Sequence, residues 1–387
     1  MDGTYFDYNA TTPIDPSVSH AMIEHLSLYG NPSSNHQIGR SARTAVQEAR
    51  EQAAALLNCN ASELHFTSGG SESNNWAVKG WLSQWKGTRP HVITTSIEHS
   101  SVLEVFQYAA REWGAQVTYL PVNAEGYVCP EAVAEALREE TRMISIMLAN
   151  NELGTIQPIR EVARIARSNH IFMHTDAVQA VGKISVDVQE LGVHALSFSA
   201  HKFYGPKGVG GIYLSSGYQL EPLVHGGGQE SGLRSGTENV LSLIGLREAC
   251  RLARAETAET AQRLAGYKLL LEKRLKKLSS QIRINGSMDP GRTLSNTMNI
   301  QIPNIRGEAL AAYLDHRFGI AVSVGSACSS NQEKKLSGVL MATGLTEAEI
   351  QTSIRISMGK FTRREDLDYF IDSIEQALEH FYRLMPA

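Results

Sequence analysis

Short runs of β-branched and apolar residues alternate with amphipathic stretches along the first 250 residues. The runs predict strands at 91–95, 117–121, 143–149, 170–174, 195–199 and 211–214. From residue 38 to residue 57, apolar side chains recur every three or four positions, which predicts a helix with one apolar face. Strands that alternate with helices of this length are joined by crossovers. The pattern therefore predicts an α/β fold with a mostly parallel sheet covered by helices on both faces.

The pattern changes after about residue 238. An Ala-, Leu-, Glu- and Lys-rich stretch that reaches residue 278 predicts one long helix or two shorter ones. A closing amphipathic helix is expected at 364–384, after strands at 281–285, 296–302, 320–324 and 353–357. We therefore expect two domains. The large α/β domain would span residues 15–258, and the smaller α+β domain would combine residues 1–14 with 259–387.

Composition narrows the class of protein. Hydrophobic residues make up 42% and charged residues 20% of the chain, which is ordinary for a globular protein. Lys and Arg number 36 against 40 Asp and Glu, so no basic surface indicates a nucleic-acid partner. No run of 18 apolar residues predicts a membrane span. Four cysteines without a C-x-x-C pair predict neither disulfides nor a metal site, which favours a reducing, cytoplasmic location.

Residues 64–75 predict a strand, a tight glycine turn and the start of a helix. Their sequence is Leu-His-Phe-Thr-Ser-Gly-Gly-Ser-Glu-Ser-Asn-Asn. Free N–H groups at a helix amino end favour anions, and glycine lets a phosphate approach closely. The spacing matches neither the dinucleotide fingerprint nor the P-loop. An ordinary strand–helix turn capped by Ser71 explains the segment equally well.

Two later strands of the predicted sheet end in polar residues. Asp176 and Gln179 follow one strand, and Ser199, His201 and Lys202 end the next one, before a glycine-rich turn. Open α/β sheets bind ligands at the carboxyl ends of their strands. Taken singly, the aspartate could cap a helix and the lysine could be solvated. Together with an anion site they fit pyridoxal phosphate, whose aldehyde forms a Schiff base with lysine and whose protonated ring nitrogen pairs with a carboxylate.

Cys328 differs from the other cysteines in its surroundings. It lies in Gly-Ser-Ala-Cys-Ser-Ser at 325–330, a small and polar stretch that predicts an exposed, mobile loop. An accessible thiolate is a nucleophile and is easily oxidised, so such a position indicates a use. The remaining three, Cys59, Cys129 and Cys250, lie in or beside helical segments, and we expect them to be buried and inert.

Arg355 and His99 each allow a structural and a functional interpretation. Arg355 lies between two isoleucines of an expected strand, where it is either a solvent-facing charge or a clamp for a carboxylate. The planar guanidinium suits the second interpretation, because it can donate two parallel hydrogen bonds. His99, in Ile-Glu-His-Ser at 97–100, taken alone reads as a helix cap or a core histidine.

In order along the chain, these segments resemble cysteine desulfurases of the NifS/IscS type. That group belongs to the class V aminotransferases among the fold-type I pyridoxal phosphate enzymes. The matching segments include Tyr-Phe-Asp-Tyr-Asn-Ala-Thr-Thr at 5–12, Gly-Asn-Pro-Ser-Ser at 30–34, Asn-Asn-Glu-Leu-Gly-Thr at 150–155, Ser-Ala-His-Lys at 199–202 and Arg-Ser-Gly-Thr-Glu-Asn at 234–239. The loop of Cys328 resembles the long-loop subgroup. Residues 331–338 depart from the usual run, which affects the expected docking of the loop or of its sulfur acceptor.

The resemblance implies the fold of these enzymes and pyridoxal 5′-phosphate as the cofactor. Ten residues would contact it: Gly70, Ser71, His99, Asn151, Asp176, Gln179, Ser199, His201, Lys202 and Thr237. Lys202 would form the Schiff base, Asp176 would pair with the ring nitrogen and His99 would stack on the ring. Gln179 would hydrogen-bond the phenolic oxygen. The phosphate would lie on Gly70, Ser71, Ser199 and His201, with Thr237 entering from the neighbouring subunit of a homodimer with shared active sites.

The resemblance also implies a reaction. L-cysteine would bind with its carboxylate on Arg355 and with Asn151 beside it, and Lys202 would remove the Cα proton. His99 would assist with the thiol proton, and Cys328 would then attack the sulfur. The products would be L-alanine and a Cys328 persulfide for a sulfur-acceptor or scaffold protein. Two alternatives stay open: a cysteine/selenocysteine lyase that does not need this thiol, and a sulfur-relay scaffold without turnover.

Overall fold

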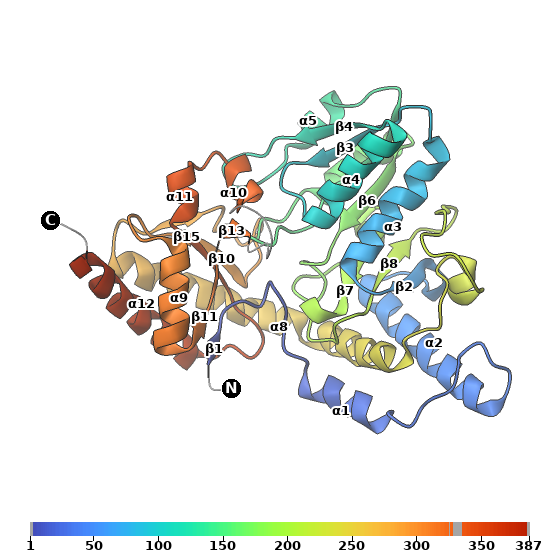
Figure 1. Cartoon of the computed structure of the whole chain (residues 1–387), viewed down its shortest axis with the longest axis horizontal. Helices are drawn as coiled ribbons and strands as arrows, with labels where there is room; N and C mark the ends of the chain where they lie inside the picture. Colours follow the sequence, from blue (N-terminus) through green and yellow to red (C-terminus); the bar gives the residue numbers. More distant parts are fainter. Residues whose placement is uncertain (1–2, 325, 328–334, 385–387) are drawn as a thin grey trace.

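The computed structural model describes residues 3–324, 326–327 and 335–384. The two largest of the four β-sheets in the described residues lie side by side, each with its own helices, and the long helix α8 (Val240–Leu278) runs along both (Figure 1).

The larger sheet has seven strands in the order β2-β8-β7-β6-β5-β3-β4. They are β2 (Leu64–Thr67), β3 (His91–Thr95), β4 (Gln116–Leu120), β5 (Thr141–Ser145), β6 (Phe172–Asp176), β7 (Ala195–Ser199) and β8 (Gly210–Leu214). Only β8 runs against its neighbours, β2 and β7, and every other pair is parallel. The predicted α/β fold with a mostly parallel sheet is therefore confirmed.

Helices cover both faces of this sheet, as the alternation of side chains along its strands requires. Phe172 packs with one core, beneath α3 (Gly70–Leu82) and α4 (Ser100–Trp113). Its neighbour Met173 packs with the opposite core, beneath α2 (Gln37–Leu57), α6 (Ile159–Ser168) and the first part of α8. The remaining helices of this part are α1 (Pro16–Glu24), α5 (Pro130–Glu135) and α7 (Val188–Leu191).

The smaller sheet is antiparallel, in the order β12-β15-β10-β9. Its strands are β9 (Arg283–Asn285), β10 (Thr297–Gln301), β12 (Ser323–Val324) and β15 (Ser353–Ser357), and its covering helices are α9 (Gly307–Phe318) and α12 (Arg364–Leu384). Short elements complete this part: β1 (Thr4–Tyr5), β11 (Ile320–Ala321), β13 (Ser326–Ala327), β14 (Lys335–Leu336), α10 (Gly338–Ala342) and α11 (Glu347–Gln351). Phe6 is fully buried in the core of this part, so the amino-terminal segment packs with the carboxyl-terminal elements.

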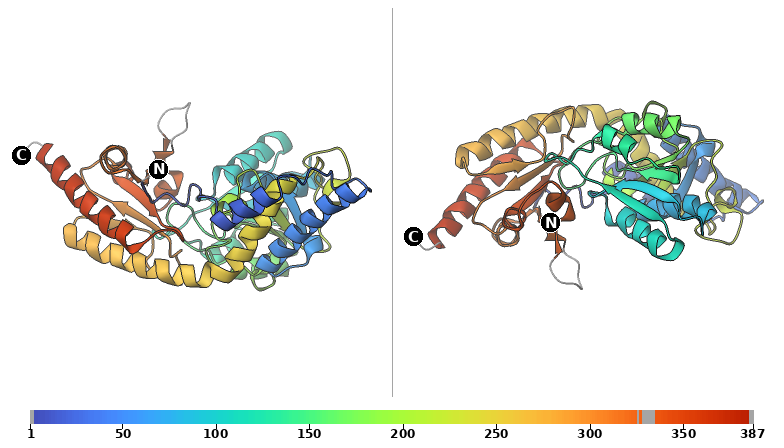
Figure 2. Two further views of the ribbon diagram at one scale, coloured as in Figure 1. Left: turned by 90° about the horizontal axis from the view of Figure 1, so that it is seen from below. Right: turned by 90° about the horizontal axis from the view of Figure 1, so that it is seen from above.

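Residues 240–278 form one helix, which decides between the two possibilities that the sequence allowed. α8 has 39 residues, about 58 Å at 1.5 Å per residue. Leu246 packs in a core of the larger part, and Leu271 packs in the core of the smaller part. Figure 2 shows α8 extending along one side of both parts.

Some boundaries differ from the prediction. β5 ends at Ser145 rather than at residue 149, and Leu148 N–H still donates to the carbonyl of Asp176 at 2.8 Å outside the regular ladder. β6 extends to Asp176, so this carboxylate ends the strand instead of following it. The strand expected at 320–324 is two short ones with different partners, β11 beside β1 and β12 beside β15.

Candidate functional site

A cavity of about 210 Å³ lies where β6 and β7 end and α3 begins. Nine of the twelve residues proposed from the sequence line it: Gly70, Ser71, His99, Asn151, Asp176, Gln179, Ser199, His201 and Lys202. Because the carboxyl ends of neighbouring parallel strands meet at one edge of the sheet, residues distant in sequence come together here.

The amino end of α3 forms one wall of the cavity. Gly69 has φ +150°, and a Cβ at Gly70 would lie 2.5 Å from Val178 Cγ2, so both positions require glycine. Gly69 is the N-cap residue just before α3 and no side chain caps the helix, so Ser71 is not the cap that an ordinary turn would have. The free N–H groups of the first turn and the helix dipole favour an anion here.

Asp176 is held by two donors. Its Oδ2 accepts from Asn74 Nδ2 at 2.7 Å and its Oδ1 from Val178 N at 2.9 Å. Asn74 Nδ2 also donates to Ser101 Oγ at 2.9 Å, and this hydroxyl lies 2.8 Å from His99 Nδ1. His99 accepts from Ser101 N at 3.1 Å and so caps α4 while it lines the cavity. His99 is therefore a helix cap that also lines the cavity, and the alternative of a core histidine is wrong because the residue is exposed.

Lys202 points into the site rather than into solvent. It ends the short 3₁₀ turn of Ala200–Lys202 after β7, and its Nζ donates to the carbonyls of Asn9 at 2.6 Å and Ala10 at 2.8 Å. Burial, followed by the positive charge of Arg355, lowers the pKa of Lys202 to about 8. Near pH 8 a large share of this amine is therefore uncharged and nucleophilic.

His201 follows the same strand and is also an uncharged group. Burial, followed by the charge of Lys202, lowers the pKa of His201 to about 4. Its Nδ1 lies 3.1 Å from Thr11 Oγ1. The imidazole can therefore serve as a hydrogen-bonding group at neutral pH.

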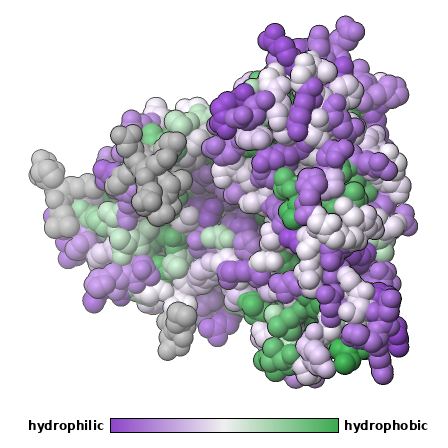
Figure 3. Space-filling view, turned by 45° about the vertical axis from the view of Figure 1, so that its right-hand side comes forward, coloured by the Kyte–Doolittle hydropathy of each residue, from purple (hydrophilic) through white to green (hydrophobic). Residues whose placement is uncertain are grey.

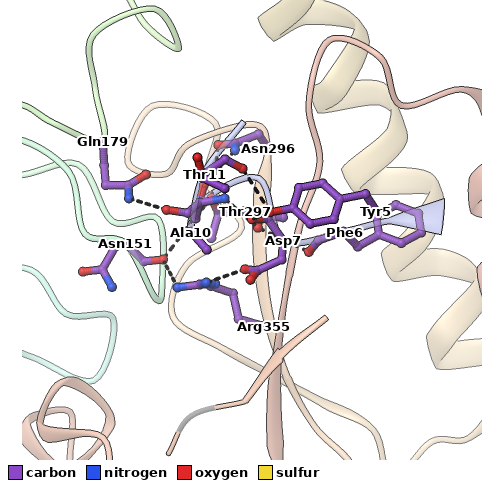
Figure 4. A network of polar contacts seen from close by, with 12 residues as sticks. Tyr5, Phe6, Asp7, Ala10, Thr11, Asn151, Gln179, Asn296, Thr297 and Arg355 are labelled. Carbon is purple, nitrogen blue, oxygen red and sulfur yellow. Dashed lines mark hydrogen bonds and ion pairs between the residues drawn. The ribbon is translucent and has the colours of Figure 1, made fainter. Parts of the chain in front are cut away.

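Arg355 reaches the site from β15 of the smaller sheet and is 8% exposed, which excludes a solvent-facing charge. Its Nη2 pairs with Asp7 Oδ1 at 2.6 Å and its Nη1 donates to the carbonyl of Asn151 at 3.1 Å (Figure 4). Arg355 Nε is buried and makes no hydrogen bond to the described residues. Although Arg355 does not line the cavity, it contacts Asn151, which does.

Two proposed residues are not part of this cavity. Cys328 lies outside the described residues, so its expected exposure stays a prediction. Thr237 is exposed and does not line the cavity of its own chain. The nearby Glu230 is almost fully buried, pairs with both terminal nitrogens of Arg50 at 2.8 and 2.6 Å, and accepts from Phe66 N at 2.9 Å. These contacts hold the segment before Thr237 against β2, the edge strand of the larger sheet.

The other cysteines are partly as expected. Cys250 is buried, and burial raises the pKa of its thiol. Cys59 is half-buried rather than buried, and desolvation still raises the pKa of its thiol to about 12. The expectation for Cys129 is wrong, because this residue lies at the surface just before α5, where its Sγ donates to Glu131 Oε2 at 2.6 Å.

The described residues contain neither a candidate metal site nor a candidate membrane-spanning helix. No group of three His, Cys, Asp or Glu side chains in the described ranges is arranged to bind a metal ion. Within the same part of the chain, no helix combines the length and the apolar character that crossing a membrane requires.

Sequence reasoning missed five residues of the cavity wall: Asn74, Ser101, Met147, Ala149 and Val178. Asn74 carried a usable signal, because it lies one helical turn after Gly70 and therefore on the same face of α3. Asn9 was missed too, although it is 1% exposed and bonds to Lys202 and Gln179.

The residues of this cavity fit pyridoxal phosphate. Its lining offers free N–H groups for a phosphate, a carboxylate for a pyridine nitrogen and an amine of lowered pKa. All three features are supplied by residues of a single chain, without a contribution from a second subunit.

Comparison with known proteins agrees with this chemistry. The family described as aminotransferase class-V, whose enzymes use pyridoxal phosphate, matches residues 4–370. Cysteine desulfurase IscS of Dictyoglomus turgidum is 44% identical over 383 residues, which cover 99% of this chain and 96% of that protein. The solved structure of a NifS-like protein is 40% identical, with a TM-score of 0.91 over 98% of this chain and all of that one. The structure of SspA in complex with cysteine is 36% identical, with a TM-score of 0.81 over 93% of this chain and all of that one. The chain belongs to the class-V aminotransferase family, within its group of cysteine desulfurases.

Proposed function

We propose that the protein is a pyridoxal-phosphate-dependent cysteine desulfurase that converts L-cysteine to L-alanine and retains the sulfur as a persulfide on Cys328. The observation that carries the proposal is the Lys202 amine, with its pKa of about 8, in one cavity with the Asp176 carboxylate and the amino end of α3. Family membership supports the same reaction.

The cofactor, when bound, supplies an electron sink for the negative charge that develops at the substrate Cα. Asp176, fixed by Asn74 and Val178, would pair with the ring nitrogen. Lys202 Nζ would anchor the cofactor and, once released by the substrate, remove the Cα proton and later return a proton. Its lowered pKa supports these roles, because an uncharged amine is required to anchor the cofactor and to remove the Cα proton, and the ammonium formed by that step can then return a proton.

Arg355 would bind the carboxylate of L-cysteine. Its guanidinium already contacts Asp7 and the Asn151 carbonyl, so it is held in one orientation, and Nε still lacks a partner among the described residues. Asn151 would orient the substrate beside the cofactor, and His99 would stack on the ring and accept the thiol proton. Gly70, Ser71, Ser199 and His201 would hold the phosphate.

Cys328 would perform the sulfur transfer. Its thiolate attacks the substrate sulfur, the substrate C–S bond breaks, and the bonding pair stays with the carbon skeleton, which becomes L-alanine after protonation. The new S–S bond is a persulfide, whose outer sulfur then passes to an acceptor or scaffold protein, as in iron–sulfur cluster assembly.

We further propose a homodimer with shared sites. Thr237, which is exposed and away from its own cavity, would hold the phosphate of the partner subunit. Ile23, Leu26 and Tyr29 are 64%, 65% and 80% exposed, which supports an apolar contact between copies. On the face of the molecule that Figure 3 shows, hydrophobic side chains gather at the lower end, which is the height at which α1 lies in Figure 1. Co-expressed T237A and K202A chains should regain activity in mixed dimers, where one site has both residues intact.

Two further proposals concern the division into domains and the location of the protein in the cell. Residues 15–258 would act as the cofactor-binding domain, and residues 1–14 with 259–387 as the smaller domain that carries the cysteine loop. The packing of Phe6 in the second core supports this division. The cytoplasm is the proposed location, which the free thiols of Cys59, Cys129 and Cys250 support.

The decisive experiment measures L-alanine and protein-bound persulfide with C328A. We expect loss of the persulfide and a fall in alanine production of at least about 100-fold, while the visible band of bound pyridoxal phosphate is kept. C129A, which removes an exposed thiol elsewhere, is the matched control and should behave like the unmodified protein. Alanine release at the full rate by C328A would instead indicate a lyase. A protein that binds the cofactor but turns over no cysteine would be a scaffold.

A further inference from the structure

Lys183 is a second lysine beside the cavity, on the loop that follows β6. Its Nζ donates to Asn9 Oδ1 at 2.8 Å and to Gln179 Oε1 at 2.5 Å. No carboxylate among the described residues forms an ion pair with it. Lys183 therefore lies in the polar network without a compensating charge.

The surroundings of Lys183 favour an uncharged amine. Burial, followed by the charges of Lys202 and Arg355, lowers the pKa of Lys183 well below its ordinary value. The other titratable groups that face it are His201, whose own pKa is lowered in part by Lys183, and the tyrosines Tyr8 and Tyr204 across a small internal cavity. An uncharged amine has two N–H groups, and two acceptors lie in reach.

Lys183 and the Asn9 carbonyl together determine how the Gln179 amide is oriented. The amide oxygen accepts from Lys183, while Nε2 donates to the Asn9 carbonyl at 2.9 Å. A rotated amide would place its oxygen against the Asn9 carbonyl, so two acceptors would face each other. Gln179 lines the cavity, where its second N–H is the group left to donate.

Asn9 links this pair to Lys202. Its carbonyl accepts from Lys202 Nζ at 2.6 Å as well as from Gln179, and its side chain accepts from Lys183 and from Asn296 Nδ2 at 3.0 Å. Figure 4 shows Gln179, Asn151 and Asn296 gathered around this amino-terminal segment. A change at Lys183 therefore reaches Gln179 directly and Lys202 through the buried Asn9.

We propose that Lys183 is a positioning residue, which fixes the Gln179 amide so that an N–H rather than the oxygen faces the phenolic oxygen of the cofactor. The inference rests on the proposed function, because the proposed function places the phenolic oxygen of the cofactor beside Gln179. A donor stabilises negative charge on the phenolic oxygen and therefore lowers the pH at which the visible band of the bound cofactor titrates.

The test is a spectrophotometric pH titration of the holoenzyme. In K183M we expect the midpoint of the visible band to rise by about 0.5 to 1 pH unit, the effect of one lost hydrogen bond. In the Q179A background the same substitution should produce no further shift. K183Q, which keeps an N–H at this position, should stay within about 0.3 pH unit of the unmodified enzyme.

The matched control is K268M. Lys268 is a buried lysine on α8 whose pKa burial likewise lowers to about 8, and it donates to Thr293 Oγ1 at 3.1 Å and the Leu294 carbonyl at 3.0 Å, away from the site. Its substitution should leave the midpoint unchanged. An unshifted K183M, or an equal shift of K183M in the Q179A background, would overturn the inference.

Failure of the inference is distinguishable from failure of the proposed function. An unmodified protein that gains no visible band with pyridoxal phosphate contradicts the proposed function. A normal band that does not respond to K183M contradicts only the part assigned to Lys183. Where K183M does not fold, K183A decides, because it also removes the donor: a raised midpoint supports the inference, and an unshifted midpoint refutes it.

Discussion

Lys202 should combine with pyridoxal phosphate at a pH about two units lower than an ordinary lysine does. Burial is the main reason, because it disfavours the ammonium form, and the positive charge of Arg355 adds to it. The prediction is therefore tested by varying the pH at which pyridoxal phosphate is added back to the cofactor-free protein and measuring how fast it combines with Lys202.

The pKa of about 8 sets the magnitude. At pH 7.5 about a quarter of such an amine is uncharged, whereas only about one in a thousand ordinary lysine side chains is uncharged. If the intrinsic reactivity of the two amines is the same, Lys202 should react roughly 200-fold faster at this pH. The rate should rise with pH and level off above about pH 9.

The assay follows the growth of the visible band after mixing, from pH 6 to pH 10, with Nα-acetyl-lysine as the control for the cofactor's own titration. A midpoint near 8 is expected. R355M removes the second cause, so its midpoint should rise by less than about one unit, since burial remains. A midpoint near 10 in the unmodified protein would refute the reasoning, because it would mean that the amine is fully solvated.

Two further predictions concern the walls of the cavity. N74L removes a donor from Asp176 and should lower kcat roughly tenfold or more, since a hydrogen bond to a charged acceptor is lost; N75A, one position along α3, should be near the unmodified rate. G70A places a Cβ 2.5 Å from Val178 Cγ2 and should weaken pyridoxal phosphate binding about tenfold in an absorbance titration. Adding V178A should restore most of the affinity, and a G70A enzyme of unchanged affinity would contradict the close contact.

Periodicity and motifs determined much of this protein. The strands at 91–95, 195–199 and 353–357 and the helix at 364–384 have the bounds expected from the sequence. Local patterns suffice for such elements, because alternation and helical spacing are properties of neighbouring residues. Lys202, Asp176 and Gly70 were also foreseeable, since strand ends and glycine turns are visible in one stretch of chain.

The tertiary structure alone decided what lies between distant segments. Arg355 is buried against Asp7, 348 positions away, and no local pattern separates this from a solvent-facing strand residue. Asn9 gathers Lys183 and Gln179 by the same kind of long-range contact, and Cys129 is exposed although its neighbourhood favoured burial. Sequence periodicity reports which face of an element is apolar. The partner of each polar atom depends on how the elements pack, because burial and hydrogen-bond geometry are properties of the assembled chain.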